Sequence, residues 1–144
     1  MQFLEKLKPL GLLVLRLALG ASFMFHGYPK LSDPASWLKA FPGFGFPAYF
    51  AYIAGILELF GGGLLVIGLF TRGAGLLLAI EMGLVLGRVE LPTLGIYGFG
   101  HYELPLLLGA ATLALTTTGA GVISLDAFTF ESRQKAPKKF KTRD

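Results

Sequence analysis

Four long apolar segments divide the sequence, and each is close to the length that crosses a lipid bilayer as a helix. They run over about residues 9–28, 48–70, 73–89 and 101–118, and a membrane span takes about 20 helical residues. The segments are rich in leucine and lack the two-residue alternation of strands. The pattern therefore predicts an all-α fold, an integral membrane four-helix bundle.

The segments between the predicted spans have the composition of loops at a membrane surface. The stretch SDPASWLKAFPGFGFPAYF combines proline, glycine and aromatic residues, so we do not expect it to be regular helix throughout. Trp37 and the Phe and Tyr residues around it favour the headgroup level of a bilayer. The link Thr71-Arg72 joins the second and third spans, and LPTLGIYGFG precedes the fourth.

Composition also favours a membrane domain over a soluble one. Of the 144 residues, 53% are hydrophobic and 15% are charged, which is less polar surface than a soluble domain of this length needs. The chain has no cysteine, which excludes disulfides, thiolate chemistry and Cys-ligated zinc or iron–sulfur clusters. The N-terminus begins like a signal peptide, but Arg16 interrupts its apolar run and no small-x-small cleavage pattern follows, so we expect a retained first span.

The basic residues predict the orientation in the membrane. Nine lie on the side of the two termini and three on the other side, and basic residues are enriched in cytoplasmic loops, so both termini are predicted to be cytoplasmic. Residues 1–128 would form the transmembrane domain, and residues 129–144 a disordered tail drawn to anionic lipid, although a solubilising and orienting role explains the tail equally well. The nine are Lys6, Lys8, Arg72, Arg133, Lys135, Lys138, Lys139, Lys141 and Arg143, and the three are Lys30, Lys39 and Arg88.

The third predicted span has a small-residue face and a polar face. Small residues at intervals of four form a stripe where another helix backbone can approach closely. Glu81 lies about 200° around the helix from one of them, and Arg88 returns to nearly the same face as Glu81. The stripe residues are Gly75, Ala79, Gly83 and Gly87.

Three ionisable residues fall in the middle and inner part of the predicted bundle. An ionised side chain at mid-bilayer costs about 3 kcal/mol even on lenient scales, and Glu58 and Glu81 are too short to reach the interface. We expect Arg16 to pair with Glu58, Glu81 or both. Alternatively, one glutamate carries a proton at neutral pH, since an apolar environment disfavours the charged form. These three buried residues would either fix the register of the helices or handle protons.

Four polar residues fall at the opposite, external boundary of three spans, where decoration of the interface is the simpler explanation. If they converge instead, the arginine offers a planar fork of donors to an anion or a quinone carbonyl, and a histidine could pass a proton. The glutamate could orient a histidine. A metal site is a weaker alternative, because no short ligand spacing supports it. The four are His26, Arg88, His101 and Glu103, with Tyr102 beside them.

The chain contains RLALGASFMFHGYPKL, GILELFGGGLLVIGLFTRGAGLLLAIEM, HYELPLLLGAATLAL and TTTGAGVISLDAF, in that order. Their strongest pieces include Arg16, Glu58 and Ser124-Leu125-Asp126. Together, over about residues 13–128, they resemble the DoxX/DoxD family of small bacterial membrane proteins. The resemblance implies a four-helix membrane bundle and, more loosely, membrane redox chemistry.

One branch of the family is the quinone-reducing subunit of thiosulfate:quinone oxidoreductase, and other members assist oxidative-stress complexes. The family often ends its fourth span with Gly-Pro-Gly-Arg before Ser-Leu-Asp. Here Gly119-Ala120-Gly121-Val122 stands at that place. The missing arginine argues against transfer of the thiosulfate activity in particular.

The favoured hypothesis is a quinone-interacting oxidoreductase subunit, multi-pass in the bacterial cytoplasmic (inner) membrane. It would oxidise a small reduced sulfur compound or link a redox partner protein to the quinone pool, with quinone as substrate or acceptor. The sequence has no Cys, flavin fingerprint or mid-helix haem pair, so electrons would come from the substrate or the partner. His26, Arg88, His101 and Glu103 form the predicted catalytic group, and Arg16, Glu58, Glu81 and Tyr102 the predicted binding group.

Two other classes remain open. A non-enzymatic membrane scaffold or assembly factor of a redox or oxidative-stress complex would use the polar core only to specify packing. A transporter of protons or small solutes is the third class, although four spans without an inverted repeat are few for one unless the chain forms a homo-oligomer. Membrane lipid is an expected partner, and nucleic acid is not.

Overall fold

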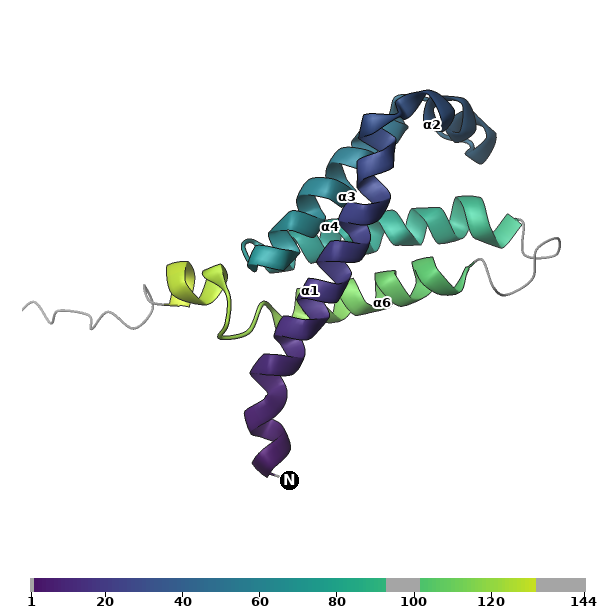
Figure 1. Cartoon of the computed structure of the whole chain (residues 1–144). Helices are drawn as coiled ribbons and strands as arrows, with labels where there is room; N and C mark the ends of the chain where they lie inside the picture. The colour runs from purple at the N-terminus through teal and green to yellow at the C-terminus, as the bar shows by residue number, and fades with distance from the viewer. Residues whose placement is uncertain (1, 93–101, 132–144) are drawn as a thin grey trace, which may run out of the picture.

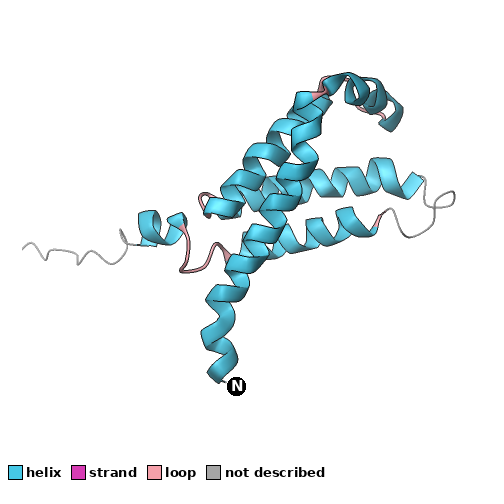
Figure 2. Ribbon diagram, viewed as in Figure 1, coloured by secondary structure: helices cyan, strands magenta, loops and turns pink. Residues whose placement is uncertain are grey.

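Every regular element that the structure describes is helical (Figures 1 and 2). The computed structural model describes residues 2–92 and 102–131, and within these ranges it contains no strand, which confirms the predicted all-α fold class for this part of the chain. The elements are α1 (Gln2–Ser32), α2 (Pro34–Ala40), η1 (Phe41–Phe44), α3 (Phe50–Ile67), α4 (Thr71–Val85), η2 (Leu86–Glu90), α6 (Glu103–Thr118) and η3 (Ala127–Glu131).

The long helices form two antiparallel pairs, α1 with α3 and α4 with α6 (Figure 1). The α1/α3 pair crosses the α4/α6 pair instead of lying parallel to it, and α3 contacts α4 at the crossing. The short elements α2 and η1 lie at the end of the α1/α3 pair where α1 gives way to α3. This end is remote from the N-terminus.

Among the described helices, two are long and apolar enough to cross a membrane, over Glu5–Ser32 and Phe50–Ile67. The apolar helix α6 is shorter, with 16 residues. The predicted third span also differs in detail, because α4 ends at Val85 and the chain continues as the π-helical turn η2. Of the predicted disordered tail, residues 129–131 belong to the π-helical turn η3, and residues 132–144 lie outside the described residues.

The first helix is longer than the sequence pattern predicted. The predicted span ended near residue 28, whereas α1 continues through Pro29 to Ser32. A proline inside a helix removes one backbone hydrogen bond and strains the preceding turn. Despite this cost, α1 does not end before Pro29. As a consequence Lys30, expected in an external loop, belongs to the helix and is 8% exposed.

The backbones of α1 and α3 approach each other at two places where only glycine fits. A β-carbon on Gly20 would lie 2.6 Å from the carbonyl oxygen of Gly62, and one on Gly62 would lie 2.7 Å from the carbonyl oxygen of Gly20. Two turns further along, a β-carbon on Gly27 would lie 2.6 Å from the amide nitrogen of Leu59. Small residues of this kind allow close helix packing inside a membrane.

The small-residue stripe predicted on the third span is used only in part. Gly75 packs against α6, where an added β-carbon would lie 3.0 Å from the carbonyl oxygen of Thr112. Added β-carbons on Gly83 and Gly87 would meet nothing within 4 Å. Near the end of α4 the close contact comes from α6 instead, where a β-carbon added to Gly109 would lie 3.1 Å from Cβ of Met82.

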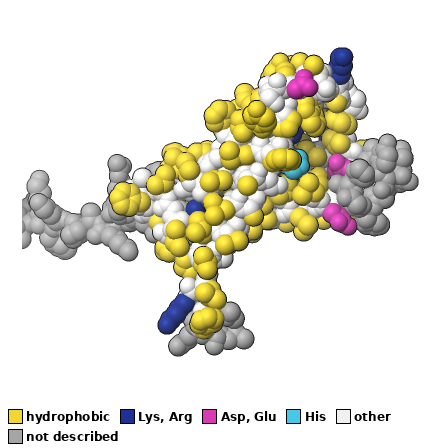
Figure 3. All heavy atoms as spheres, viewed as in Figure 1, with side chains coloured by type: hydrophobic (Ala, Val, Ile, Leu, Met, Phe, Trp, Pro, Cys, Tyr) yellow, Lys and Arg dark blue, Asp and Glu magenta, His cyan; other side chains and the backbone are white. Residues whose placement is uncertain are grey.

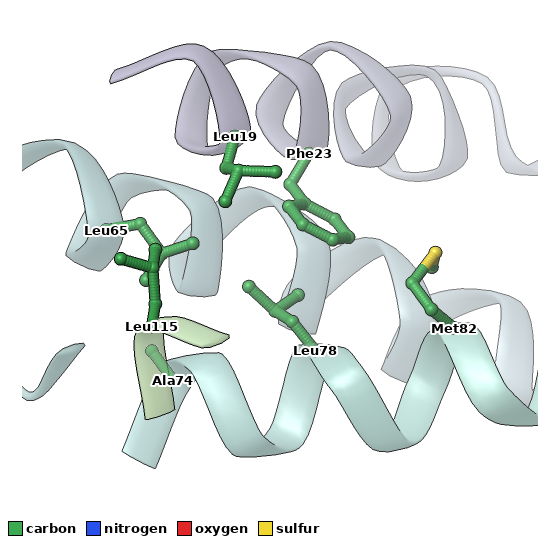
Figure 4. Packing of buried hydrophobic residues seen from close by; sticks show 7 residues of the cluster. All are labelled: Leu19, Phe23, Leu65, Ala74, Leu78, Met82 and Leu115. Carbon is green, nitrogen blue, oxygen red and sulfur yellow. The ribbon is translucent and has the colours of Figure 1, made fainter. Parts of the chain in front are cut away.

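The hydrophobic core lies where the two helix pairs cross (Figure 4). All four long helices contribute to it, so the crossing is held by apolar packing. Much of the remaining surface is also hydrophobic (Figure 3), as a helical protein surrounded by lipid requires. The core residues are Leu19, Phe23, Leu65, Ala74, Leu78, Met82 and Leu115.

Replacing Gly62 by alanine is predicted to destabilise the α1/α3 pair, because the new methyl group would collide with the Gly20 carbonyl. The expected cost is about 1–3 kcal/mol, as for other overpacked sites, measured by reversible unfolding in mixed micelles. Gly63→Ala is the matched control, since a β-carbon there meets nothing within 4 Å. Equal stability of the two variants would contradict the close backbone contact.

Candidate functional site

Arg16 is fully buried and holds three backbone carbonyl groups together. Its Nε donates to the carbonyl oxygen of Leu65 at 3.1 Å, and its Nη1 donates to those of Ala120 at 2.6 Å and Ile123 at 3.0 Å. The side chain is 1% exposed. The guanidinium thus joins α1 and α3 to the segment that follows α6.

The expected pairing of Arg16 with a glutamate is therefore wrong within the described part of the chain. The prediction came from converting sequence position into depth, which does not fix the register of α1 against α3; the glycine contacts of the two helices do. Arg16 consequently lies opposite the end of α3, at Leu65, about two turns from Glu58. A guanidinium carries five N–H donors; those of Arg16 bond to main-chain oxygens, and the carboxylate that interacts with it electrostatically is Asp126.

The segment after α6 is fixed at a second point by Asp126. One carboxylate oxygen accepts the amide hydrogen of Phe70 at 2.7 Å, and the other accepts that of Thr71 at 2.9 Å. These amides begin α4, where backbone N–H groups lack partners within the helix. Asp126 is thus a structural cap for α4.

Glu58 pairs with Lys30 instead of Arg16. The ammonium of Lys30 forms a salt bridge with Glu58, and Glu58 is 4% exposed. Lys30 also lies over the ring of Trp37, with Nζ 5.0 Å from the ring centroid. The ion pair is thus covered by an aromatic side chain from α2, near the end of the helix pair remote from the N-terminus.

A cavity of about 380 Å³, here called the His26 cavity, opens beside this ion pair. Its polar wall is formed by His26, Lys30, Glu58 and Glu90. The Nδ1 atom of His26 lies 2.8 Å from the carbonyl oxygen of Ser22, to which it can donate only as N–H, so Nε2 is the atom left for a ligand. The apolar wall includes Phe23, Trp37, Phe41, Phe44, Phe46, Met82, Leu104 and Leu108.

A second cavity of about 190 Å³, the Glu81 cavity, lies between α3 and α4. Glu81 is 9% exposed, and its Oε2 is buried without a hydrogen-bond partner among the described residues. The walls are otherwise almost entirely apolar, from residues such as Phe50, Ile53 and Ile80. The two cavities share Lys30, Phe41, Phe46, Glu58 and Val85.

The external group predicted from the sequence is only partly brought together. His26 lines the cavity, whereas Arg88 is exposed and lies over the ring of Phe46, 5.9 Å from its centroid. Glu103 is exposed, and neither it nor Tyr102 lines the His26 or the Glu81 cavity. His101 lies outside the described residues. Within those residues, no group of three His, Asp or Glu side chains could hold a metal ion.

Lys30 and Trp37 were missed by the sequence reasoning, which placed both at the membrane surface. A signal was present, because His26 and Lys30 are four residues apart and share one face of a helix that continues past Pro29. Trp37 gave no comparable signal, since its position over Lys30 depends on how α2 folds back over the helix pair.

These features define a class: a small all-helical membrane protein whose apolar helices enclose an ion pair beside a cavity. Within that class, the chain belongs to the DoxX family, whose model matches residues 11–89. The matched residues include the Arg16 side chain, the glycine contacts of α1 and α3, and both partners of the Lys30–Glu58 pair. Members of this family are membrane proteins.

Two relatives extend the similarity over most of the chain. A Bacillus subtilis (strain 168) protein described as "Putative oxidoreductase CatD" is 31% identical over 125 residues, covering 87% of this chain and 91% of its own length. A Haemophilus influenzae protein described as "Uncharacterized protein" is 34% identical over 130 residues, covering 88% of this chain and 96% of its own length. No solved structure is significantly similar to the chain.

Removing one partner of the buried ion pair is predicted to cost more than removing both. Lys30→Met leaves the Glu58 carboxylate without its counter-ion, at a cost of about 3–5 kcal/mol. The double variant Lys30→Met/Glu58→Gln should recover much of this stability in the same unfolding assay. Lys39→Met, at an exposed position of α2, should change little. A double variant as unstable as Lys30→Met alone would contradict a direct pair.

Replacing Arg16 by glutamine is predicted to loosen the segment after α6 from α1. Hydrogen bonds made by a charged group contribute about 1.5–3 kcal/mol each, and glutamine cannot reach three carbonyl groups at once. Limited proteolysis should therefore cut near residues 119–124 faster in Arg16→Gln than in the unmodified protein. Arg88→Gln is a control at an exposed position near Phe46, and equal cleavage rates for Arg16→Gln and the unmodified protein would rule out the anchoring role.

Proposed function

We propose that this chain is a quinone-interacting oxidoreductase, or the membrane subunit of one, in the bacterial cytoplasmic (inner) membrane. The observation that carries the proposal is the His26 cavity, which combines a polar wall with aromatic walls inside an apolar helical protein. Its volume of about 380 Å³ falls in the range of about 300–1,000 Å³ typical of small-molecule sites. A flat, lipid-soluble ring with polar oxygens fits this combination.

Each wall of the cavity has a chemical counterpart in a quinone. The rings of Trp37, Phe41 and Phe46 offer faces for stacking. Lys30 can donate a hydrogen bond to a carbonyl oxygen, and Nε2 of His26 can accept or pass on a proton. Conversion of a quinone to a quinol takes two electrons and two protons. The electrons would come from a reduced sulfur compound or a redox partner protein, and the side chains of this chain handle the protons.

The comparisons support a redox role in general terms. The chain belongs to the DoxX family, and the printed description of its Bacillus subtilis relative is that of an oxidoreductase. Arg88, Glu103 and His101 are not needed for the proposed quinone contacts. Their predicted catalytic roles pass to Lys30 and Glu58, which line the cavity together with His26.

We further propose that four helices cross the membrane as a bundle with both termini in the cytoplasm. The distribution of basic residues supports this orientation more clearly once Lys30 is placed inside the protein. Only Lys39 and Arg88 then remain on the external side, against nine basic residues on the side of the termini. The short apolar helix α6 would need a locally thinned bilayer or a tilted neighbour to match the membrane.

One observation favours the rival function of a non-enzymatic scaffold or assembly factor. Several residues that carry the family resemblance make packing contacts and line neither cavity. They include Arg16, Gly20, Gly62 and Asp126. A scaffold needs only these contacts, whereas an oxidoreductase also needs the cavity to bind a ligand. Ligand binding therefore separates the two functions.

A quinone analogue with a short tail is predicted to quench the fluorescence of Trp37, the single tryptophan of the chain, which lines the His26 cavity. The quenching should saturate in lipid nanodiscs. His26→Ala should weaken binding about fivefold, since one hydrogen bond contributes about 1 kcal/mol. Lys39→Met, on the exposed face of α2, should leave the Kd unchanged.

The same preparations are then supplied with reduced sulfur donors while quinol formation is followed by absorbance. Saturable quenching with turnover supports an oxidoreductase that works on its own, and saturable quenching without turnover supports a subunit that needs a redox partner. Quenching that rises linearly with the analogue and is equal in His26→Ala would exclude the proposed site and favour the scaffold.

A further inference from the structure

Glu81 has a buried oxygen atom that nothing in the described part of the chain satisfies. Its Oε2 is inaccessible and without a hydrogen-bond partner, and the residue lines the Glu81 cavity between α3 and α4. An unpaired polar atom in an apolar interior costs about 1–3 kcal/mol. Because the cavity adjoins the Glu81 side chain, a rotation of the carboxyl group would bring this oxygen to a ligand placed there.

The charges around Glu81 do not balance if both carboxyl groups are ionised. Glu81 interacts electrostatically with Glu58 and Lys30, which already form an ion pair. From α1, His26 faces Glu58, and the residues of α6 that line the neighbouring His26 cavity are the apolar Leu104, Pro105 and Leu108. One lysine thus stands against two carboxyl groups.

A surplus negative charge inside a membrane protein is expensive, and one bound proton removes it. A protonated carboxyl group is also a hydrogen-bond donor. The unsatisfied oxygen, the adjoining cavity and the charge count therefore all indicate one protonated carboxyl group that donates a hydrogen bond to a ligand.

We propose that Glu81 carries this proton and donates it as a hydrogen bond to a carbonyl oxygen of a lipid-soluble ligand in the Glu81 cavity. The inference rests on the proposed function, because it assigns the second oxygen of the quinone. A 1,4-quinone carries its carbonyl oxygens at opposite ends of the ring. One oxygen meets Glu81. The ring lies beside the residues that line both cavities, and the other oxygen meets Lys30 and His26.

The proton balance of the reduction follows from this placement. Two electrons from the reduced sulfur compound or partner protein enter the ring. One proton moves from the carboxyl group of Glu81 to the nearer oxygen, and the second is taken up from water at Nε2 of the exposed, neutral His26 and passed to the other oxygen. The product is a quinol, Glu81 is left as a carboxylate, and Lys30 then stands between two carboxylates until a proton returns.

The Glu81 cavity is also placed for entry from the bilayer. Ile53, Ile80 and Leu84 line it, and each of them is also exposed on the outer surface of α3 or α4, by 49%, 53% and 46% respectively. In a membrane these side chains would contact acyl chains. A lipid-soluble ligand can therefore reach Glu81 without passing through water.

Infrared difference spectroscopy tests the proposal directly, using the full chain in lipid nanodiscs at neutral pH. Exposed carboxyl groups titrate near pH 4 and give no acid carbonyl band there. We expect one such band in the unmodified protein, its loss in Glu81→Gln, and an unshifted band in Glu58→Asp, which keeps the second carboxyl group. Glu81→Asp should keep a shifted band, which guards against a variant that fails to fold. Glu103→Gln, at an exposed position outside both cavities, is the matched control.

Addition of the quinone analogue should shift the band of the unmodified protein to lower frequency, as a new hydrogen bond requires. Absence of the band, a shift of the band in Glu58→Asp instead of in Glu81→Asp, or a band insensitive to the analogue would each overturn the inference. Saturable quenching of Trp37 fluorescence without an acid band would refute the role of Glu81 and leave the proposed function standing. Absence of the quenching itself would refute both.

Discussion

The close approach of α1 and α3 is the constraint on which the rest of the structure depends. At Gly20 and Gly62, and again at Gly27, no side chain separates the two backbones. Contacts at two levels fix both the rotation and the register of one helix against the other. That register sets Arg16 beside the carbonyl group of Leu65 at one end of the pair and Lys30 beside Glu58 at the other.

The two ends of this pair solve the problem of a buried charge in different ways. All the hydrogen bonds of Arg16 go to main-chain carbonyl groups, which cannot change their charge, and this suits an anchor. Lys30 faces side chains that can gain or lose protons, namely Glu58 and, through electrostatic interaction, Glu81. The first arrangement holds the segment after α6 in place. The second arrangement can exchange protons, and both cavities lie at that end of the helix pair.

The crossing of the helix pairs explains why cavities form at that end. Apolar side chains fill the crossing itself (Figure 4), and beyond it α4 diverges from α1. The aromatic residues of α2 and η1 cover the gap without filling it. Trp37 therefore covers Lys30 of the ion pair and also, together with Phe41 and Phe44, lines the His26 cavity. Packing and binding meet in the same residues.

The sequence by itself determined which segments are helical, because a long apolar run is a local property that needs no partner. It also identified Arg16, Glu58 and Glu81 as ionisable residues inside the protein, and the family through their neighbours. It did not determine which charges meet. That choice depends on the register of α1 against α3, which follows from glycine contacts between residues some 30 to 40 positions apart and from a helix that continues through Pro29. Only the tertiary structure decided that Lys30 and Trp37 belong to the site and that Arg16 does not, since a difference of two helical turns changes every partner of a buried charge.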